Sequence, residues 1–224
     1  GMPGITKVVL GENTAVQAIA KLFASTSLET LKAWRTVQGV QEMSPYLSKR
    51  FVDSRFEYVK VLSGQTQLRP RWKRGVQLVD SSLGEVVGQT YVAKYFPPSS
   101  KAQMVELIAN LKVAMAERIE KAPWMAPATK QAALTKLSKM TVMVGYPDKW
   151  RDYAGLKIDA NDLYGNVRRS GQFEWAYALK DLGRPVDHGK WAMTPQTVNA
   201  YNGGLENKIG FPAGILQAPY FEPA

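Results

Sequence analysis

The 224 residues contain few of the side chains from which most catalytic centres are built. There is one histidine, His188, and there is no cysteine. A catalytic zinc site usually takes two or three histidines, so we expect His188 to be a surface or turn residue and not a metal ligand. The lack of cysteine excludes disulfides, thiolate zinc sites and cysteine nucleophiles. The chain also has no nucleophile elbow, Gly-x-Gly-x-x-Gly loop or Walker loop, so we expect no catalytic residue, metal or cofactor in it.

The segment near the C-terminus has a pattern that could bind a peptide. It runs from Val198 to Gln217 and reads VNAYNGGLENKIGFPAGILQ. Thr197–Tyr201 is strand-like, and Ile209–Phe211 can return antiparallel after a turn at Asn202-Gly203. An exposed edge strand binds an extended peptide through main-chain hydrogen bonds, and a neighbouring amide such as that of Asn199 can donate and accept. From the residues alone, the simpler interpretation is that Asn199 satisfies a turn.

Hydrophobic spacing predicts a mainly α fold, with several helices ahead of this short β-hairpin. Two further segments have the composition of strands, Ile5–Leu10 at the start and Thr141–Pro147 in the middle of the chain. Gly84 and Gly88 lie four residues apart on one helix face, which indicates close packing against a neighbouring segment. The expected helices cover residues 15–24, 28–40, 46–62, 71–96, 104–119, 127–140 and 162–182.

The charge of the chain permits several kinds of partner and specifies none. Lys and Arg number 29 against 19 acidic residues, a net charge of +10. Four basic residues surround Trp72, which could form a nucleic-acid patch or the solvated first turns of a helix whose Trp72 packs inward. We favour the helix because the cluster carries no nucleic-acid motif. No apolar run approaches the roughly 20 residues that cross a bilayer. We therefore expect no nucleic-acid partner and no membrane-spanning segment in this chain.

The composition changes at Gly183. Glycine and proline crowd the last forty or so residues, so helices are not expected there. We therefore divide the chain into a helical region, residues 1–182, and a second structural unit, residues 183–224, that contains the hairpin.

Long segments of the chain resemble the neprilysin-like zinc metalloendopeptidases, the relatives of neprilysin, endothelin-converting enzyme and bacterial PepO-type oligopeptidases. The resemblance covers nearly the whole chain from about Ala15 onward, and its motifs occur in the family's order. They are LSGQTQLRPRWKR, EVVGQTYVAKYF, APWMAPATKQAALTKLSKM, VGYPDKWRDYAGL, RPVDHGKWAMTPQTVNAY and NKIGFPAGILQAPYF.

The resemblance implies a two-lobed peptidase with an enclosed cavity. Residues 1–182 would belong to the helical lobe, and residues 183–224 would begin the catalytic lobe with its substrate-binding edge hairpin. The family's zinc motif, His-Glu-x-x-His, follows the last of these segments, so we expect this chain to be a middle fragment that ends before the motif. It would then be inactive alone. Zinc would belong to the intact enzyme, and the chain's partners would be a peptide substrate and the remainder of the catalytic lobe.

The resemblance also assigns substrate-binding roles. Asn199, Ala200 and Tyr201 match the family's Asn-Ala-Tyr/Phe segment, and Tyr220 falls where the family places an aromatic wall of a substrate pocket. The chain departs from the family at two positions in the hairpin: Asn202-Gly203-Gly204 replaces the usual Tyr-Asn-Pro, and Gly210 replaces a β-branched residue. Because glycine costs roughly 0.5–1 kcal/mol of order within an element, both changes are expected to loosen the hairpin.

An alternative function stays open beside the peptidase fragment: a stand-alone helical module, descended from this family, that binds peptides or proteins. The residues do not fix the compartment. Only the resemblance points to a periplasmic or extracellular location, because bacterial members of the family are often exported.

Overall fold

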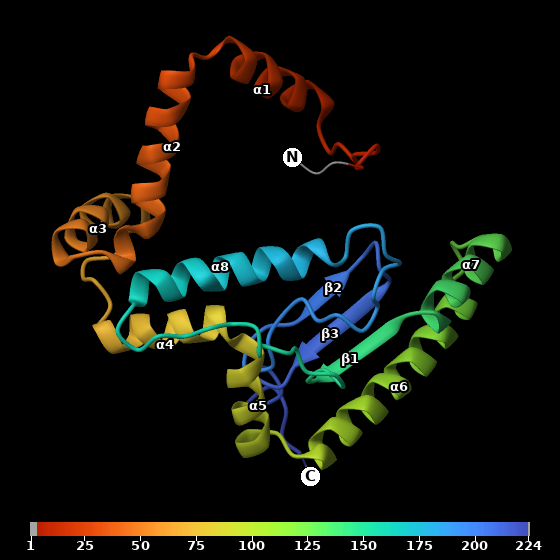
Figure 1. Ribbon diagram of the computed structural model, residues 1–224. Helices are drawn as coiled ribbons and strands as arrows, with labels where there is room; N and C mark the ends of the chain where they lie inside the picture. The colour runs from red at the N-terminus through yellow and green to blue at the C-terminus, as the bar shows by residue number, and fades with distance from the viewer. Residues whose placement is uncertain (1–3, 224) are drawn as a thin grey trace. The chain divides into compact units, whose positions relative to one another are not determined.

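The computed structural model describes residues 4–223 and separates into two compact units, residues 1–68 and residues 69–224. The described residues form eight α-helices, one short 3-10 helix and one three-stranded sheet (Figure 1). This confirms the predicted mainly α fold with a β-hairpin near the C-terminus. The predicted division at residue 182 is a separate matter, and it stays a prediction.

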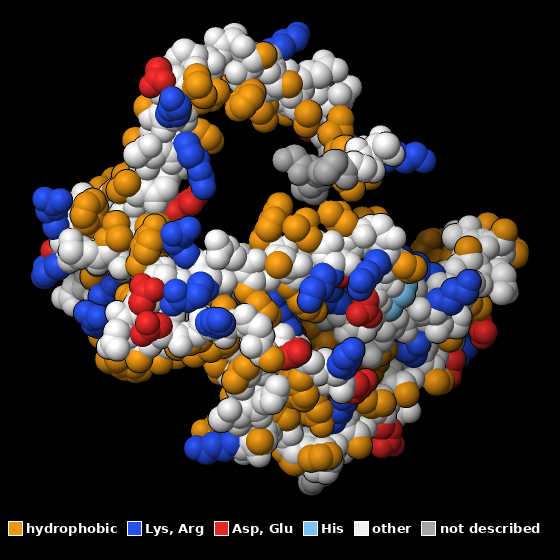
Figure 2. Space-filling model, in the orientation of Figure 1, with side chains coloured by type: hydrophobic (Ala, Val, Ile, Leu, Met, Phe, Trp, Pro, Cys, Tyr) orange, Lys and Arg blue, Asp and Glu red, His pale blue; other side chains and the backbone are white. Residues whose placement is uncertain are grey.

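All the regular structure of the first unit within residues 4–68 is helical. Ser27 caps its second helix by accepting a hydrogen bond from the Thr30 amide (3.2 Å), and Gly64 ends the third with a φ of +69°. None of its three α-helices has a fully buried residue, and Figure 2 shows hydrophobic side chains on the surface over the first two. The unit therefore leaves its apolar helix faces largely open. Its elements are α1 (Asn13–Ser25), α2 (Leu28–Met43), the 3-10 helix η1 (Ser44–Tyr46) and α3 (Lys49–Ser63).

The predicted strand at Ile5–Leu10 is wrong. The segment has no strand structure and is exposed throughout. An isolated strand has no neighbour to satisfy its main-chain donors and acceptors, so strand-like composition alone does not form one here.

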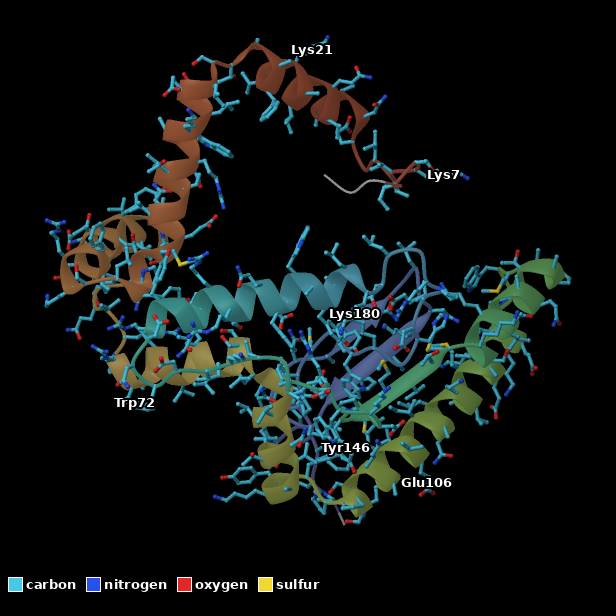
Figure 3. The ribbon with its side chains drawn as sticks, in the orientation of Figure 1. Lys7, Lys21, Trp72, Glu106, Tyr146 and Lys180 are labelled. Atoms are coloured by element: carbon cyan, nitrogen blue, oxygen red, sulfur yellow. The ribbon has the colours of Figure 1, made fainter. Side chains whose placement is uncertain are left out.

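The helices of the second unit begin with α4 (Arg71–Ser82) and α5 (Gly84–Tyr95). The single helix predicted over 71–96 is interrupted at Leu83, whose backbone angles (φ −130°, ψ 35°) are not helical. Trp72, at the start of α4 (Figure 3), is 67% exposed, so the prediction that it packs inward is wrong. The prediction for the two glycines of α5 is confirmed. A side chain at Gly84 or Gly88 would collide with Thr194 or Pro195, which means that the segment around Pro195 packs directly on the helix backbone.

Two further helices lead from α5 into the sheet. The long helix α6 (Pro98–Lys121) starts at a proline. Proline suits a first helical turn because it lacks an amide hydrogen, and the amides of that turn have no acceptor within the helix. The next helix, α7 (Pro127–Ser138), also starts at a proline, and Ala126 gives it no side-chain cap. It ends three residues before the first strand.

The sheet joins segments that are far apart in the chain. Strand β1 (Thr141–Gly145) pairs in parallel with β3 (Lys208–Pro212), and β2 (Tyr201–Gly203) pairs antiparallel with β3, so the order is β1-β3-β2. The hairpin is confirmed, but its turn comes later than predicted, and only Tyr201 of the predicted strand Thr197–Tyr201 belongs to β2. Asn202 and Gly203 belong to β2, and the chain reverses at residues 204–207, where Asn207 takes a positive φ of 51°.

One face of the sheet carries the core of the second unit. Val144 and the partly buried Ile209 and Phe211 pack with Phe96, which is 2% exposed. The remaining members of the cluster come from α6 and from the segment after β3: Met104, Ile108, Ala213 and Leu216. This core fixes β3, and through it the hairpin, against α5 and α6 (Figure 1).

The last helix, α8 (Leu163–Leu179), begins at Asp162, whose carboxylate accepts a hydrogen bond from the Gly165 amide (2.8 Å). Arg169 pairs with the same carboxylate at 3.1 Å. These contacts hold the pKa of Asp162 below its ordinary value, with the Gly165 hydrogen bond as the larger cause. From the end of α8 the chain runs without regular structure to β2.

Candidate functional site

Strand β2 is an edge of the sheet with one open side. Thr141 donates its amide hydrogen to the Asn207 carbonyl (3.0 Å), and Gly145 accepts from the Ala213 amide (2.9 Å), so the odd-numbered residues of β3 bond to β1. The even-numbered residues of β3 therefore bond to β2, and they do so opposite Tyr201 and Gly203. By the alternation of main-chain groups, those of Asn202 face away from the sheet, and the same alternation continued one residue before β2 puts those of Ala200 on that side. An extended peptide could pair with this edge.

Asn199 and Ala200 lie at the entrance of that edge, and both are exposed. The Ala200 amide donates a hydrogen bond to Oδ1 of Asn199 (2.8 Å). The outward main-chain donor at the start of the edge is therefore covered by the neighbouring side chain. Such capping of a free strand edge reduces unwanted pairing, while a side-chain amide can rotate away when another acceptor arrives.

The ring of Tyr201 lies on the face of the sheet opposite the Phe96 core. Its hydroxyl donates to Sδ of Met143 on β1 (3.3 Å) and accepts from the Ala192 amide (3.4 Å). Trp191 meets the ring edge-on, with centroids 6.5 Å apart. Tyr201 thus contacts its own unit on several sides, while the main chain beside it forms the open edge.

Tyr220 and His188 lie apart from the hairpin contacts. Tyr220 is 74% exposed, and its amide donates to the Gln217 carbonyl (2.9 Å) in a turn after β3. His188 is exposed in a turn in which Asp187 accepts a hydrogen bond from the Gly189 amide (2.9 Å). Neither side chain has a contact in the structure that assigns it a role.

A cavity of about 830 Å³ lies between β1, α6, α8 and the segments that follow β1 and α8. The charged side chain of Arg151 lines this cavity and is only 12% exposed. Its guanidinium pairs with Glu174 (Nη1–Oε1, 2.9 Å) and lies 3.8 Å from the centroid of Tyr177. Its remaining nitrogens, Nε and Nη2, are buried without a hydrogen-bond partner, as expected for a cation stacked on aromatic rings. The Arg151 guanidinium is therefore already engaged by contacts within the protein.

Two groups near the same cavity have shifted pKa values. Burial raises the pKa of the Tyr153 hydroxyl above its ordinary value, although that hydroxyl accepts a hydrogen bond from the Glu85 amide. The hydrogen bond to Asp181 raises the pKa of Lys190. Both pKa values move further above neutral pH, so Tyr153 stays neutral and Lys190 stays positively charged at pH 7. The two shifts therefore give no sign of acid–base chemistry.

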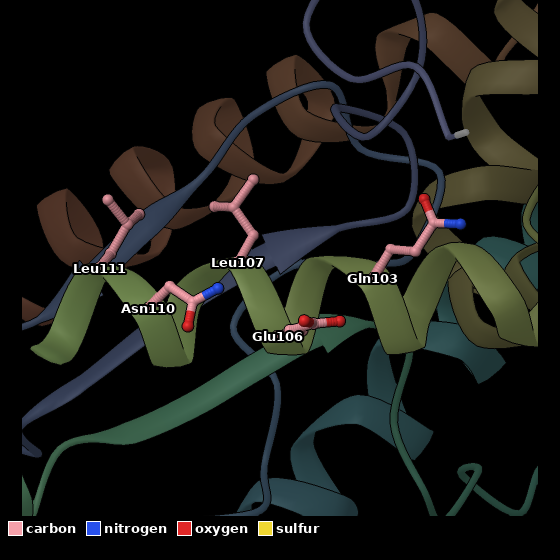
Figure 4. A pocket seen from close by; sticks show the side chains of 5 residues that line it. All are labelled: Gln103, Glu106, Leu107, Asn110 and Leu111. Carbon is pink, nitrogen blue, oxygen red and sulfur yellow. The ribbon is translucent and has the colours of Figure 1, made fainter.

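A second, smaller hollow of about 420 Å³ lies along one side of α6 (Figure 4). It is lined by side chains of that helix alone: Gln103, Glu106, Leu107, Asn110 and Leu111. Neither hollow is lined by any of the predicted substrate-binding residues. The predicted site is therefore an edge, not a pocket.

Within residues 4–223 no group of three or more His, Cys, Asp and Glu side chains is placed to hold a metal ion. In the same range, no helix has both the length and the apolar character needed to cross a membrane. The expectation that the chain itself takes no zinc stays a prediction.

Sequence reasoning named the residues of the edge but missed those that support it. The structure brings Gly210 and Met143 into one row with Tyr201, and it buries Lys208 beside them. In the sequence, Gly210 stands out only as a departure from the family that is expected to loosen the hairpin. The parallel pairing of β1 with β3 could not be predicted from the sequence, because β1 lies more than sixty residues before β3. Nothing local in the sequence gives their register.

Comparison with protein families gives a match to a model described as "Peptidase family M13", over residues 1–147. Among curated proteins, the chain is 31% identical to Neprilysin-11 of Caenorhabditis elegans over 96% of its length. It is 30% identical to Endothelin-converting enzyme 1 of Homo sapiens over 96%, and 30% identical to a Neutral endopeptidase of Lactobacillus helveticus over 97%. The chain spans 26–34% of the length of these three relatives.

Solved structures of related peptidases also match this chain. A zinc metalloprotease of Mycobacterium tuberculosis, in complex with an inhibitor, matches 92% of this chain with a TM-score of 0.86 and 45% identity. PepO of Lactobacillus rhamnosis matches 81% with a TM-score of 0.75 and 32% identity. The chain corresponds to 31% and 29% of those two chains.

Proposed function

The chain belongs to peptidase family M13, and from this we propose that it supplies the substrate-binding edge strand and the helical cavity lobe of a zinc metalloendopeptidase. The enzyme would hydrolyse peptide bonds in oligopeptides. In this proposal residues 1–182 belong to the helical lobe, and residues 183–224 begin the catalytic lobe. The chain's partners are a peptide substrate and the rest of that catalytic lobe.

The observation that carries the proposal is the free antiparallel edge of β2, with Asn199 and Ala200 at its entrance. A peptidase that accepts many sequences must hold its substrate by the main chain, because the main chain is common to all of them. Strand addition does this, since its hydrogen bonds ignore side-chain identity. The outward main-chain groups of Ala200 and Asn202 are the donors and acceptors that such a peptide would meet.

Each predicted site residue has a part in this proposal. The Asn199 side chain gives up its hydrogen bond with the Ala200 main-chain N–H and binds the substrate main chain instead. Ala200 contributes its own main-chain groups. Tyr201 continues the edge and anchors it through its ring. Tyr220, exposed after β3, offers an aromatic surface to a substrate side chain.

The residues of this chain do not fit a zinc site, because it has one histidine and the described part holds no cluster of ligating side chains. We therefore place the zinc ligands outside these 224 residues and assign the chain no catalytic residue. Its contribution to the rate is orientation. Misplacement of a bound substrate by about 1 Å can cost 10²-fold in rate.

The source gene and its protein product test this proposal together. We expect the reading frame to encode His-Glu-x-x-His within a few dozen codons after Ala224. The complete protein should cleave peptides and lose that activity on treatment with a zinc chelator. The 224-residue chain alone should cleave none and bind no stoichiometric zinc. A complete protein without the motif that nevertheless binds peptides would overturn the proposal and support the stand-alone binding module. Affinity for DNA or RNA that falls steeply with salt would support a nucleic-acid binder.

A further inference from the structure

Three residues form one row across the sheet. Gly210 of β3 is opposite Tyr201 of β2 on one side and opposite Met143 of β1 on the other. Side chains that are paired in this way project from the same face of a sheet. The central position of the row carries no side chain, and the two outer positions carry long ones.

The Tyr201 ring fills the gap above Gly210. A Cβ atom built on Gly210 would lie 2.7 Å from the Tyr201 hydroxyl oxygen and would overlap two carbons of the ring. The ring therefore lies across β3, in the space that any other residue at position 210 would take. From there its hydroxyl reaches Sδ of Met143 on the far strand (3.3 Å).

The Tyr201 side chain is also held by the segment before the hairpin. The Ala192 amide donates to the same hydroxyl (3.4 Å), and the Trp191 ring meets the Tyr201 ring edge-on at 6.5 Å. One side chain thus connects β2 to β3, to β1 and to the segment before the hairpin. An aromatic side chain that covers a glycine on the neighbouring strand is a recognised way to fix the register of a sheet.

Strand β2 needs such an anchor because it has only three residues and one neighbour. A slip of one residue would turn the main-chain groups of Ala200 toward β3 and those of Tyr201 outward. We propose that Gly210 and Met143 are positioning residues, which hold the Tyr201 ring across the sheet and thereby set which main-chain groups of β2 face the substrate. The consequence for substrate binding rests on the function proposed above.

Hydrogen exchange of the 224-residue chain tests the anchor without any catalytic activity. In Gly210→Val the new side chain and the ring compete for one space, so exchange at the Tyr201 and Gly203 amides should rise about 10-fold or more. The matched control is Gly204→Val in the same hairpin, where the added Cβ meets only Asn202 at ordinary contact distance. It should leave exchange close to that of the unchanged chain.

Removal of the ring separates this anchor from a general loss of structure. Tyr201→Ala should also speed the exchange of β2, and Gly210→Val should add nothing further in that background, because the clash has gone. Tyr201→Phe keeps the ring over Gly210 and loses only the hydroxyl contacts, so it should give a smaller increase. This variant keeps the test informative if Gly210→Val does not fold. Additive effects in the double variant, or unchanged exchange in Gly210→Val, would overturn the inference.

The complete protein then links the anchor to peptide binding. We expect Gly210→Val to raise KM for peptides about 10-fold, with a smaller change in kcat and unchanged zinc content, while Gly204→Val has little effect. Faster exchange with an unchanged KM would overturn the proposed role of the β2 edge and leave the anchor in place. Unchanged exchange would overturn the anchor itself, whatever the KM.

Discussion

The two faces of the small sheet are built in different ways. On one face Val144, Ile209 and Phe211 pack with Phe96 and residues of α6, so the surface removed from water is large and apolar. On the other face one tyrosine ring covers a glycine, and a buried lysine lies in the neighbouring row. The first arrangement stabilises the fold through area, and the second positions one short strand through a few specific contacts. Substitutions on the two faces should therefore differ in what they change.

The largest effect on stability is expected on the apolar face. Phe96→Ala removes a side chain that is 2% exposed and leaves a cavity against α6 and β1, which typically costs about 3–5 kcal/mol. The same substitution at Phe23 of α1, which is 66% exposed, should cost less than about 0.5 kcal/mol. Urea unfolding followed by circular dichroism measures both. Equal losses would mean that the core does not lie where the structure places it.

A smaller loss is expected on the second face. Lys208 is 5% exposed, donates to the Lys190 carbonyl (2.9 Å) and pairs with Glu206. Lys208→Met keeps much of the volume but leaves that carbonyl and carboxylate without their partner, which should cost about 1–3 kcal/mol. Lys121→Met, which breaks an exposed ion pair with Glu117, is the control and should change stability by less than about 0.5 kcal/mol. A gain in stability for Lys208→Met would show that the buried charge is not satisfied by these contacts.

The smallest effect on stability is expected at the start of α8, and it depends on pH. The pKa of Asp162 is lower in the folded chain than in the unfolded chain, because Gly165 and Arg169 stabilise its charged form. The charged form binds fewer protons, so its contribution is present above the unfolded pKa and is lost as pH falls through the folded pKa. Asp162→Asn should therefore be less stable than the unchanged chain at pH 7, and the difference should shrink near pH 3. A difference that does not vary with pH would show that the carboxylate charge has no part in the cap.

Local signals in the sequence were sufficient for most helices, for β1 and for the hairpin. Helical spacing, prolines at helix starts and the glycine-rich reversal act within a few residues. The spacing of Gly84 and Gly88 even predicted a close neighbour on α5, which the structure shows to be the segment around Pro195. The resemblance to known peptidases correctly gave the family.

The failures share a physical cause, which is contact between distant segments. Ile5–Leu10 has strand composition but no partner strand, and the predicted continuous helix is broken at Leu83. The turn of the hairpin comes later than the Asn-Gly signal indicated, because pairing with β3 draws Asn202 and Gly203 into β2. The row of Tyr201, Gly210 and Met143 depends on a parallel register that only the folded chain defines.

The most direct test of the proposed function is the Asn199→Ala variant of the complete protein. Its effect on stability should be negligible, because Asn199 is exposed and its oxygen bonds only the next amide. We expect kcat/KM for several peptides to fall about 10-fold or more, since a lost hydrogen bond to a buried partner costs about 1–3 kcal/mol. Thermal stability and zinc content should not change, and Asn202→Ala should stay close to the unchanged enzyme. Full activity of Asn199→Ala on all peptides would contradict the account, and so would a loss of activity explained by lost zinc or unfolding.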